Sequence, residues 1–204
     1  YDVPDGKGGT VPALIQVTKR GQIFMFDRRD GTPIAEVKEM PVPQDGGVPE
    51  DPLSPTQPYS VGMPAIGNEP LSEVRMWGAT PYDQLYCRIQ FRKLRYEGEF
   101  TPRGTATSLQ FPGFYGGMNW GSVSVDAAND LMIVNDIRMP QIVKLVPQDE
   151  VKSGGVPGDG HTGLATQLGT PYAAWKIGFN SPLAVPCHEP PYGTITAIDL
   201  KSRQ

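Results

Sequence analysis

The chain has 204 residues and a mass of 22.2 kDa, enough for one domain with a sizeable core. Its 24 glycines and 22 prolines exceed average usage and favour many short strands joined by turns over long helices. The net charge of -4, without a basic stripe that carries aromatic residues, argues against a nucleic-acid partner. No apolar run approaches the roughly 18 residues that a membrane-spanning helix requires.

The first predicted elements are two strands, at residues 14–17 and 23–26. Both are rich in apolar and β-branched residues, and the residues 19–21 between them fit a hairpin turn. Residues 27–31, with the sequence DRRDG, predict a second turn, in which carboxylates accept backbone N–H groups and the glycine takes a positive φ. A strand that ends in Asp and is followed by such a turn is typical of β-propeller blades.

A helix is predicted to begin at Thr80. Thr80 is a suitable N-cap, Pro81 fits the first helical position, and Asp83 completes a variant of the capping box. Leu85 and Ile89 stack one turn apart on this helix. The remaining charged residues predict a solvated face: Arg88, Arg92 and Lys93.

Two further segments repeat the strand pattern. In residues 121–136, serine and valine alternate up to Val125, residues 126–130 predict a turn, and residues 131–134 predict a buried return strand. The final segment, residues 193–204, alternates up to Asp199 and then enters a polar turn, as the first hairpin does.

The two strand–Asp–turn units, which end at Asp27 and Asp199, are too far apart for consecutive blades, since propeller repeats recur every 40 to 45 residues or so. We therefore expect long insertions rich in Pro and Gly at about 41–112 and 147–191. The predicted fold is mostly β: a partial β-propeller over residues 1–204, with these insertions and one short helix.

The cysteines and histidines indicate no metal site. Cys87 and Cys187 lack metal-ligand spacing and any C-x-x-C pattern, which favours two buried free thiols, with a long-range disulfide as the open alternative. His161 and His188 occur in loops without a second ligand at suitable spacing, so we expect surface loop residues. No standard catalytic motif occurs either.

The candidate site consists of Lys19, in the first hairpin turn, and Asn119 with Trp120, which open the second pair of strands. Loops between propeller strands gather around the central channel, so these residues can converge. An indole can stack on a flat ligand, an amide can bond ring carbonyls, and an ammonium can stabilise charge on a quinone oxygen. Each residue also has a purely structural interpretation, as a surface lysine, a turn asparagine and a core tryptophan.

Five stretches resemble one known family: TKRGQIFMFDRRDG, SPTQPYSVGMP, MWGATPYDQLYCRIQFRKLRYEGEFTP, FPGFYGGMNWGSVSVDAANDLMIVND and GTPYAAW…VPCHEPPYGTITAIDLKSRQ. In this order they are similar to the membrane-bound quinoprotein dehydrogenases that use pyrroloquinoline quinone (PQQ), the glucose and quinate/shikimate dehydrogenases. The resemblance implies a segment of an eight-bladed propeller at the periplasmic face of a bacterial inner membrane. It also implies ubiquinone as the electron acceptor.

The resemblance assigns roles to individual residues. Lys19 corresponds to the lysine that contacts the quinone oxygens of the cofactor, so it is predicted to act in catalysis and in cofactor binding. Asn119 falls where the quinate/shikimate branch resembles this chain and the glucose branch carries an acidic residue. Asn135 matches an asparagine near the cofactor in the glucose enzymes, and Trp120 adjoins the cofactor position.

Parts of the family pattern have no counterpart in this chain. They are the N-terminal membrane helices, the catalytic Asp base and the ligands of a Ca²⁺ or Mg²⁺ ion. We therefore expect an excised segment of roughly two to three blades, without a metal site, inactive alone and anchored through a missing N-terminal segment.

The resemblance predicts oxidation of a small-molecule substrate, quinate or shikimate, with an upstream carboxylate taking the hydroxyl proton. The alternatives are a glucose or aldose dehydrogenase and, in another class, a non-catalytic propeller-like binding module.

Overall fold

The structure is a computed structural model that describes residues 1–119, 121–152 and 163–204. Within these residues the strands form four antiparallel sheets. Two of the sheets have three strands each, in the orders β1-β2-β3 and β12-β8-β7. Their strands are β1 (Asp2–Pro4), β2 (Thr10–Val17), β3 (Ile23–Asp27), β7 (Val123–Asp126), β8 (Leu131–Ile137) and β12 (Gly193–Asp199).

Strands β2 and β3 form the first predicted hairpin. Val17 lies opposite Ile23 at its closed end. Across the turn, the N–H of Gly21 donates to the carbonyl of Thr18 at 3.0 Å, and Gly21 has a φ of +80°. This conformation suits glycine because it has no Cβ. The hairpin prediction is confirmed.

The two strand–Asp–turn units are also confirmed. At the end of β3, Asp27 Oδ1 accepts the backbone N–H of Arg29 at 2.9 Å. At the end of β12, Asp199 Oδ1 accepts the N–H groups of Lys201 and Ser202 at 2.8 and 2.7 Å. Each carboxylate thus holds the turn that reverses the chain.

Strands β7 and β8 form the predicted middle hairpin, with Val123 opposite Val134. The expectation that residues 131–134 are buried throughout is wrong, because Ile133 is 39% exposed. Since side chains alternate along a strand, only Met132 and Val134 point into the core. The other face of β8 is left exposed.

The two three-stranded sheets share one hydrophobic core. The side chains in it come from β1, β2, β3, β8 and β12 and from neighbouring loops: Val3, Ala13, Ile23, Met25, Ala35, Met63, Ile66, Met118, Met132, Val134, Ile198 and Leu200. Antiparallel sheets that pack in this way are the arrangement of neighbouring propeller blades. The prediction of a mostly β, partial propeller is confirmed.

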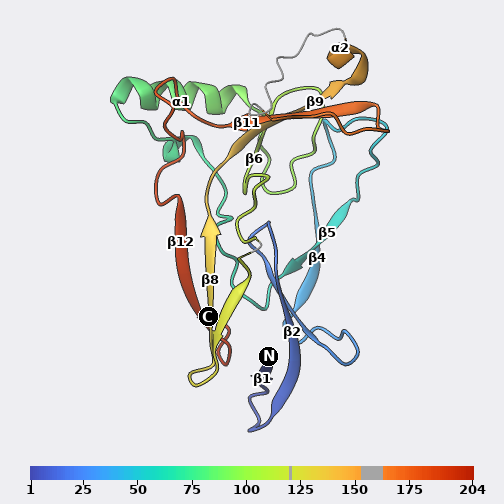
Figure 1. Ribbon diagram of the computed structural model, residues 1–204, viewed down its shortest axis with the longest axis vertical. Helices are drawn as coiled ribbons and strands as arrows, with labels where there is room; N and C mark the ends of the chain where they lie inside the picture. The colour runs from blue at the N-terminus through green and yellow to red at the C-terminus, as the bar shows by residue number, and fades with distance from the viewer. Residues whose placement is uncertain (120, 153–162) are drawn as a thin grey trace.

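The remaining strands form two more sheets. A hairpin joins β4 (Val37–Pro41) to β5 (Thr56–Ser60), and the larger sheet has the order β10-β11-β9-β6. This larger sheet crosses one end of the molecule, beside α1, and both termini lie towards the other end (Figure 1). Its strands, with the short helices nearby, are β6 (Ser108–Gln110), β9 (Gln141–Pro147), β10 (Leu164–Ala165), β11 (Tyr172–Gly178), η1 (Glu73–Arg75) and α2 (Gln148–Lys152).

The predicted helix is α1 (Pro81–Lys93), and it begins as expected. Thr80 Oγ1 accepts the N–H of Asp83 at 3.2 Å, while the Asp83 carboxylate accepts the N–H of Ala79 at 3.1 Å. Leu85 and Ile89 are 53% and 45% exposed, so neither anchors the helix to the core. No helix among the described residues is long and apolar enough to cross a membrane.

Helix α1 is tied to the fold by a disulfide between Cys87 and Cys187, whose Cα atoms lie 5.2 Å apart. The preference for two free thiols was therefore wrong. The two cysteines are 100 residues apart, and only the tertiary fold brings them together. Around the bond packs a second core: Leu71, Met76, Leu109, Phe111 and Phe179.

His188 follows this disulfide and is only 2% exposed, so the prediction of a surface loop residue was wrong for it. Its ring lies 5.3 Å from that of Phe111, within the second core. The residue is buried because the adjacent Cys187 is held against α1. His161 lies outside the described residues.

Candidate functional site

Lys19 and Asn119 meet in the structure, although 100 residues separate them in the sequence. Lys19 Nζ donates to Asn119 Oδ1 at 3.1 Å and to the carbonyl oxygen of Tyr115 at 3.0 Å. Asn119 Nδ2 donates to the same carbonyl at 2.6 Å. The ammonium, the amide and one backbone carbonyl thus form a closed triangle of hydrogen bonds.

Two glycines allow this approach. Gly116 has a φ of +91°, and a Cβ placed on it would lie 2.6 Å from Lys19 Cγ. Gly117 donates its N–H to the Lys19 carbonyl at 2.8 Å, and its own carbonyl accepts the N–H of Ile137 on β8 at 2.8 Å. The loop is therefore fixed between the hairpin turn that carries Lys19 and the end of β8.

Glu99 holds the turn from its other side. Gln22 Nε2 donates to the two Glu99 carboxylate oxygens at 3.1 and 3.3 Å, and Arg20 Nε lies 3.9 Å from Oε1. Arg20 also donates to the Glu99 backbone carbonyl, and its guanidinium lies 4.1 Å from the ring centroid of Phe100. Burial raises the pKa of the Glu99 carboxyl, and the Arg20 charge opposes this shift. The residues on both sides of Gly21 are thus anchored next to Lys19.

A cavity of about 530 Å³ opens at Lys19 and Asn119. This volume is within the range of about 300 to 1,000 Å³ typical of small-molecule and cofactor sites. The rest of its lining comes from the end of β2 and the loop before β7: Gln16, Val17, Thr18, Met118 and Ser122. An ammonium has three N–H donors, and Lys19 uses two of them on acceptors among the described residues. One donor remains for a ligand oxygen.

The other two predicted site residues are not placed in this cavity. Asn135 lies on the exposed face of β8, opposite Ile195 of β12. Its Oδ1 would be 3.4 Å from a Cβ on Gly121, so it lies close to the segment that follows Asn119. Trp120 lies outside the described residues. The roles of all four residues towards a cofactor stay predictions.

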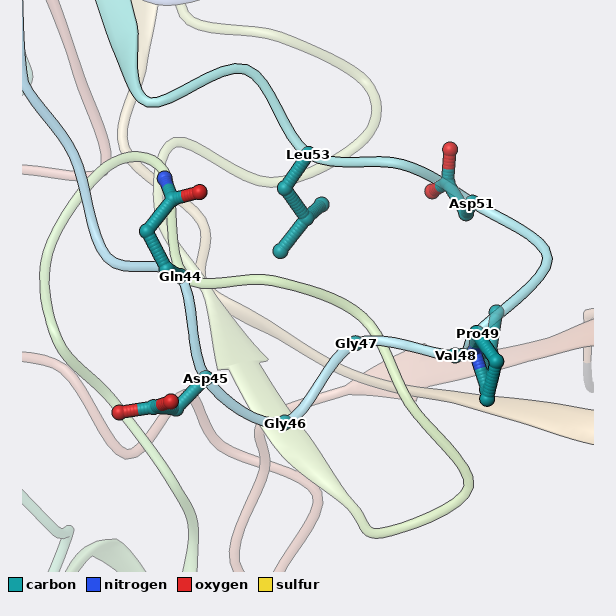
Figure 2. A pocket seen from close by; sticks show the side chains of 8 residues that line it. All are labelled: Gln44, Asp45, Gly46, Gly47, Val48, Pro49, Asp51 and Leu53. Atoms are coloured by element: carbon teal, nitrogen blue, oxygen red, sulfur yellow. The ribbon is translucent and has the colours of Figure 1, made fainter.

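Another pocket, of about 400 Å³ and open to solvent, is lined by the loop at residues 44–53 (Figure 2). Its charged side chains are Asp45 and Asp51, and the remainder is glycine, proline, glutamine and aliphatic residues. Two carboxylates without a basic residue do not suit a polyanionic ligand. Nowhere in the described ranges do three or more His, Cys, Asp or Glu side chains gather as a metal site would require.

Sequence reasoning missed the supports of the site. The YGGMN stretch at residues 115–119 does contain a signal, because paired glycines mark a close approach of two backbones. Glu99 gave no signal, since a single carboxylate far from Lys19 in sequence has no pattern that connects the two.

Two antiparallel sheets with a shared core, and inter-strand loops that bring a lysine and an amide together, define part of a β-propeller. Comparison with known proteins agrees. The PQQ family profile, described as "Glucose/ethanol/alcohol dehydrogenase, beta-propeller domain", matches residues 1–204, and the chain belongs to this family.

Among individual relatives, a "Probable quinate dehydrogenase (quinone)" of Xanthomonas campestris pv. juglandis is 47% identical over 99% of this chain. A "Glycerol dehydrogenase large subunit" of Gluconobacter thailandicus is 45% identical over 100% of the chain, and the "Quinoprotein glucose dehydrogenase" of Escherichia coli is 39% identical over 97%. The chain spans 26%, 29% and 25% of the lengths of these three relatives. No solved structure gives a significant match.

Proposed function

We propose that this chain forms part of a longer, quinone-linked PQQ-dependent dehydrogenase, called the full-length enzyme below. It oxidises a cyclic polyol acid, quinate or shikimate, and passes the electrons to ubiquinone. The observation that carries the proposal is the Lys19 ammonium, which faces a cofactor-sized cavity with one N–H donor unused among the described residues. The family assignment supports PQQ as the ligand.

The residues present fit such a ligand. PQQ is a flat aromatic quinone with three carboxylates, and it supplies the two-electron acceptor for oxidation of a CH–OH group when bound. Both acceptors of Lys19 are neutral oxygens, and no carboxylate lies within ion-pair distance of it among the described residues. The full positive charge is therefore available to an anionic ligand, and its position is fixed before the ligand arrives.

Each group has a distinct task in this proposal. Lys19 would stabilise negative charge on a quinone oxygen, and Asn119 would orient the lysine and offer its remaining amide N–H. Asn135, on the exposed face of β8, and Trp120 are also proposed to contact the cofactor. The base that takes the substrate hydroxyl proton, and the ligands of a Ca²⁺ or Mg²⁺ ion, are proposed to come from outside this chain.

The choice of quinate over glucose rests on charge. Quinate and shikimate carry a carboxylate, whereas glucose is neutral. An uncharged amide at position 119 beside an unpaired ammonium favours an anionic substrate, and a carboxylate at 119 would repel it. Overall identity does not decide the substrate, since a relative named for glycerol is nearly as similar as one named for quinate.

A substrate scan of the full-length enzyme tests this choice. With a quinone acceptor, we expect a higher kcat/KM for quinate and shikimate than for glucose or glycerol. The variant Asn119→Glu should lower kcat/KM for quinate more than for glucose, with little change in the unfolding temperature. A wild-type preference for glucose would contradict the substrate, and a sharp fall in stability with unchanged cofactor binding would make Asn119 a structural turn residue.

The same scan tests the rival class, a non-catalytic binding module. In such a module Lys19, Asn119 and Trp120 would be merely turn and core residues, and the protein would oxidise none of the four polyols after incubation with PQQ and Ca²⁺. We further propose that the full-length enzyme lies at the periplasmic face of an inner membrane and is anchored by a segment outside this chain. All 204 residues are assigned to its propeller domain, with the insertions at about 41–112 and 147–191.

A further inference from the structure

Arg103, in the loop between α1 and β6, has no acidic partner among the described residues. Its Nη1 donates to Ser108 Oγ at 3.3 Å and to the Leu109 carbonyl at 3.5 Å, both neutral acceptors at long distances. No carboxylate oxygen of the described residues lies within 4.0 Å of it. Burial, with the nearby charges of Arg20 and Arg95, lowers the pKa of Arg103 to about 10.

The two neighbouring arginines, unlike Arg103, each lie near a carboxylate. Arg95 forms an ion pair with Glu97 at 2.6 Å, and Arg20 lies 3.9 Å from Glu99. A partly buried guanidinium without a counter-charge is costly, and folded proteins usually pair such a group. Arg103 is thus a positive charge that the described part of the fold leaves without an anion.

A cavity of about 360 Å³ opens beside Arg103. Arg20, Gln57 and Thr101 line it with polar groups, and Phe100 and Leu53 line it with apolar ones. This lining has no residue in common with the cavity at Lys19.

Asp51 is the one acidic residue of the cavity lining. It belongs to the loop of Figure 2, is exposed, and makes no ion pair with either arginine within 4.0 Å. Arg20 lies near Glu99, so among the described residues Arg103 is the arginine of this lining that has no carboxylate beside it.

We propose that this cavity binds a small anion whose carboxylate or phosphate group pairs with Arg103 and Arg20. A guanidinium presents two parallel N–H donors that match either oxyanion, and the side-chain amide of Gln57 offers a further N–H donor. The apolar wall from Phe100 and Leu53 suits a ligand with a short carbon skeleton more than bare phosphate. The site is separate from the cofactor cavity and does not depend on the proposed function.

The test uses the full-length protein with PQQ bound, so that the cavity at Lys19 is occupied. Its unfolding temperature is measured against increasing malonate, and separately against inorganic phosphate, with the ionic strength held constant by chloride. We expect malonate and phosphate each to raise the unfolding temperature in a saturable way, and malonate to do so at a lower concentration. If malonate and chloride changed the unfolding temperature equally, the proposal would be overturned. It would also be overturned if the unfolding temperature did not respond to malonate because a carboxylate from elsewhere in the protein already pairs with Arg103.

Two variants and a control locate the effect. Arg103→Met should abolish this rise. Because it removes an unpaired, partly buried charge, it should also raise the unfolding temperature measured without added anion. Arg103→Lys keeps the charge but loses the paired donors, and should weaken the apparent affinity for malonate at least tenfold. Arg92→Met, at an exposed arginine of α1, should leave both results unchanged.

A response of Arg103→Met or Arg103→Lys equal to that of the wild type would overturn the proposal. Turnover of quinate should be unchanged in both variants. This last result distinguishes the anion site from the active site, so either proposal can fail alone.

Discussion

Gly116 decides whether Lys19 can occupy its place at the cavity. Its φ of +91° is unfavourable for any residue with a Cβ, and that Cβ would also meet the lysine side chain at 2.6 Å. Two effects are therefore combined at one position: backbone strain and a direct collision with the proposed catalytic group.

The variant Gly116→Ala should differ from a matched control, Gly31→Ala, in its effect on turnover. Gly31 has a similar φ of +79°, but a Cβ on it would meet nothing within 4 Å, so only the strain applies there. We expect Gly31→Ala to lose about 1 to 2 kcal/mol of stability, and Gly116→Ala to lose more, because the collision with Lys19 adds to the strain. Only Gly116→Ala should also lower kcat, by tenfold or more, in the full-length enzyme. Equal turnover in the two variants would show that the position of Lys19 does not limit the reaction.

Among the elements, the loop that joins β11 to β12 carries a buried histidine that makes stability depend on pH. His188 in this loop is 2% exposed, and its Nδ1 has no hydrogen-bond partner among the described residues. Burial, followed by the charge of Arg75, lowers its pKa from 6.5 to about 4. Arg138 acts in the same direction, and the carboxylates of two glutamates oppose it: Glu69 and Glu189.

Stability should therefore fall as the pH decreases from about 6.5 to about 4. In this window the unfolded chain binds a proton that folded His188 does not, so acid favours unfolding. The expected loss is on the order of 3 kcal/mol at the acid end. His188→Phe, which keeps the ring packed beside Phe111, should remove this part of the pH dependence. Identical pH dependences of the unfolding temperature in wild type and variant would contradict the assignment.

The elements differ in how far the sequence alone predicts them. Local chemistry predicted the hairpin at residues 14–26, the cap at Thr80 and the turns at Asp27 and Asp199, because each depends on neighbours a few residues away. The disulfide and the burial of His188 depend on segments about 100 residues apart, which no local pattern encodes.

The candidate site was likewise predictable only in part. Lys19 and Asn119 were predicted from their turns and from the family resemblance, and the structure places them in contact. Glu99 was missed, because only the tertiary fold brings it into contact with Gln22 in the turn that carries Lys19. Asn135 was predicted for the site, but it is not among the residues that line the cavity.

At the scale of the whole molecule, one face of the sheet β12-β8-β7 is exposed. Ile195 is 79% exposed, and Ile133 and Ile137 are 39% and 37% exposed on the same face. In a closed propeller, a neighbouring blade covers such a face. The exposed isoleucines are therefore consistent with a place beside further blades in the full-length enzyme.

Residues 1–204 alone are expected to show no dehydrogenase activity and no tight PQQ binding, because part of the proposed site lies elsewhere. The exposed sheet face should also promote self-association. Titration of the purified segment with PQQ and Ca²⁺, followed by dye-reduction assays with quinate, shikimate and glucose, checks this. Saturable sub-micromolar binding with turnover would show that the chain is a complete enzyme.

The most direct measurement is quinate turnover by the full-length enzyme with Lys19→Ala, compared with wild type and with Lys38→Ala at an exposed lysine of β4. The loss of one preorganised charge commonly costs about 3 to 4 kcal/mol of transition-state stabilisation. We expect kcat to fall by two orders of magnitude or more in Lys19→Ala, with the fold intact, and to stay at the wild-type value in Lys38→Ala. Near-normal turnover in Lys19→Ala would contradict the proposed role of Lys19.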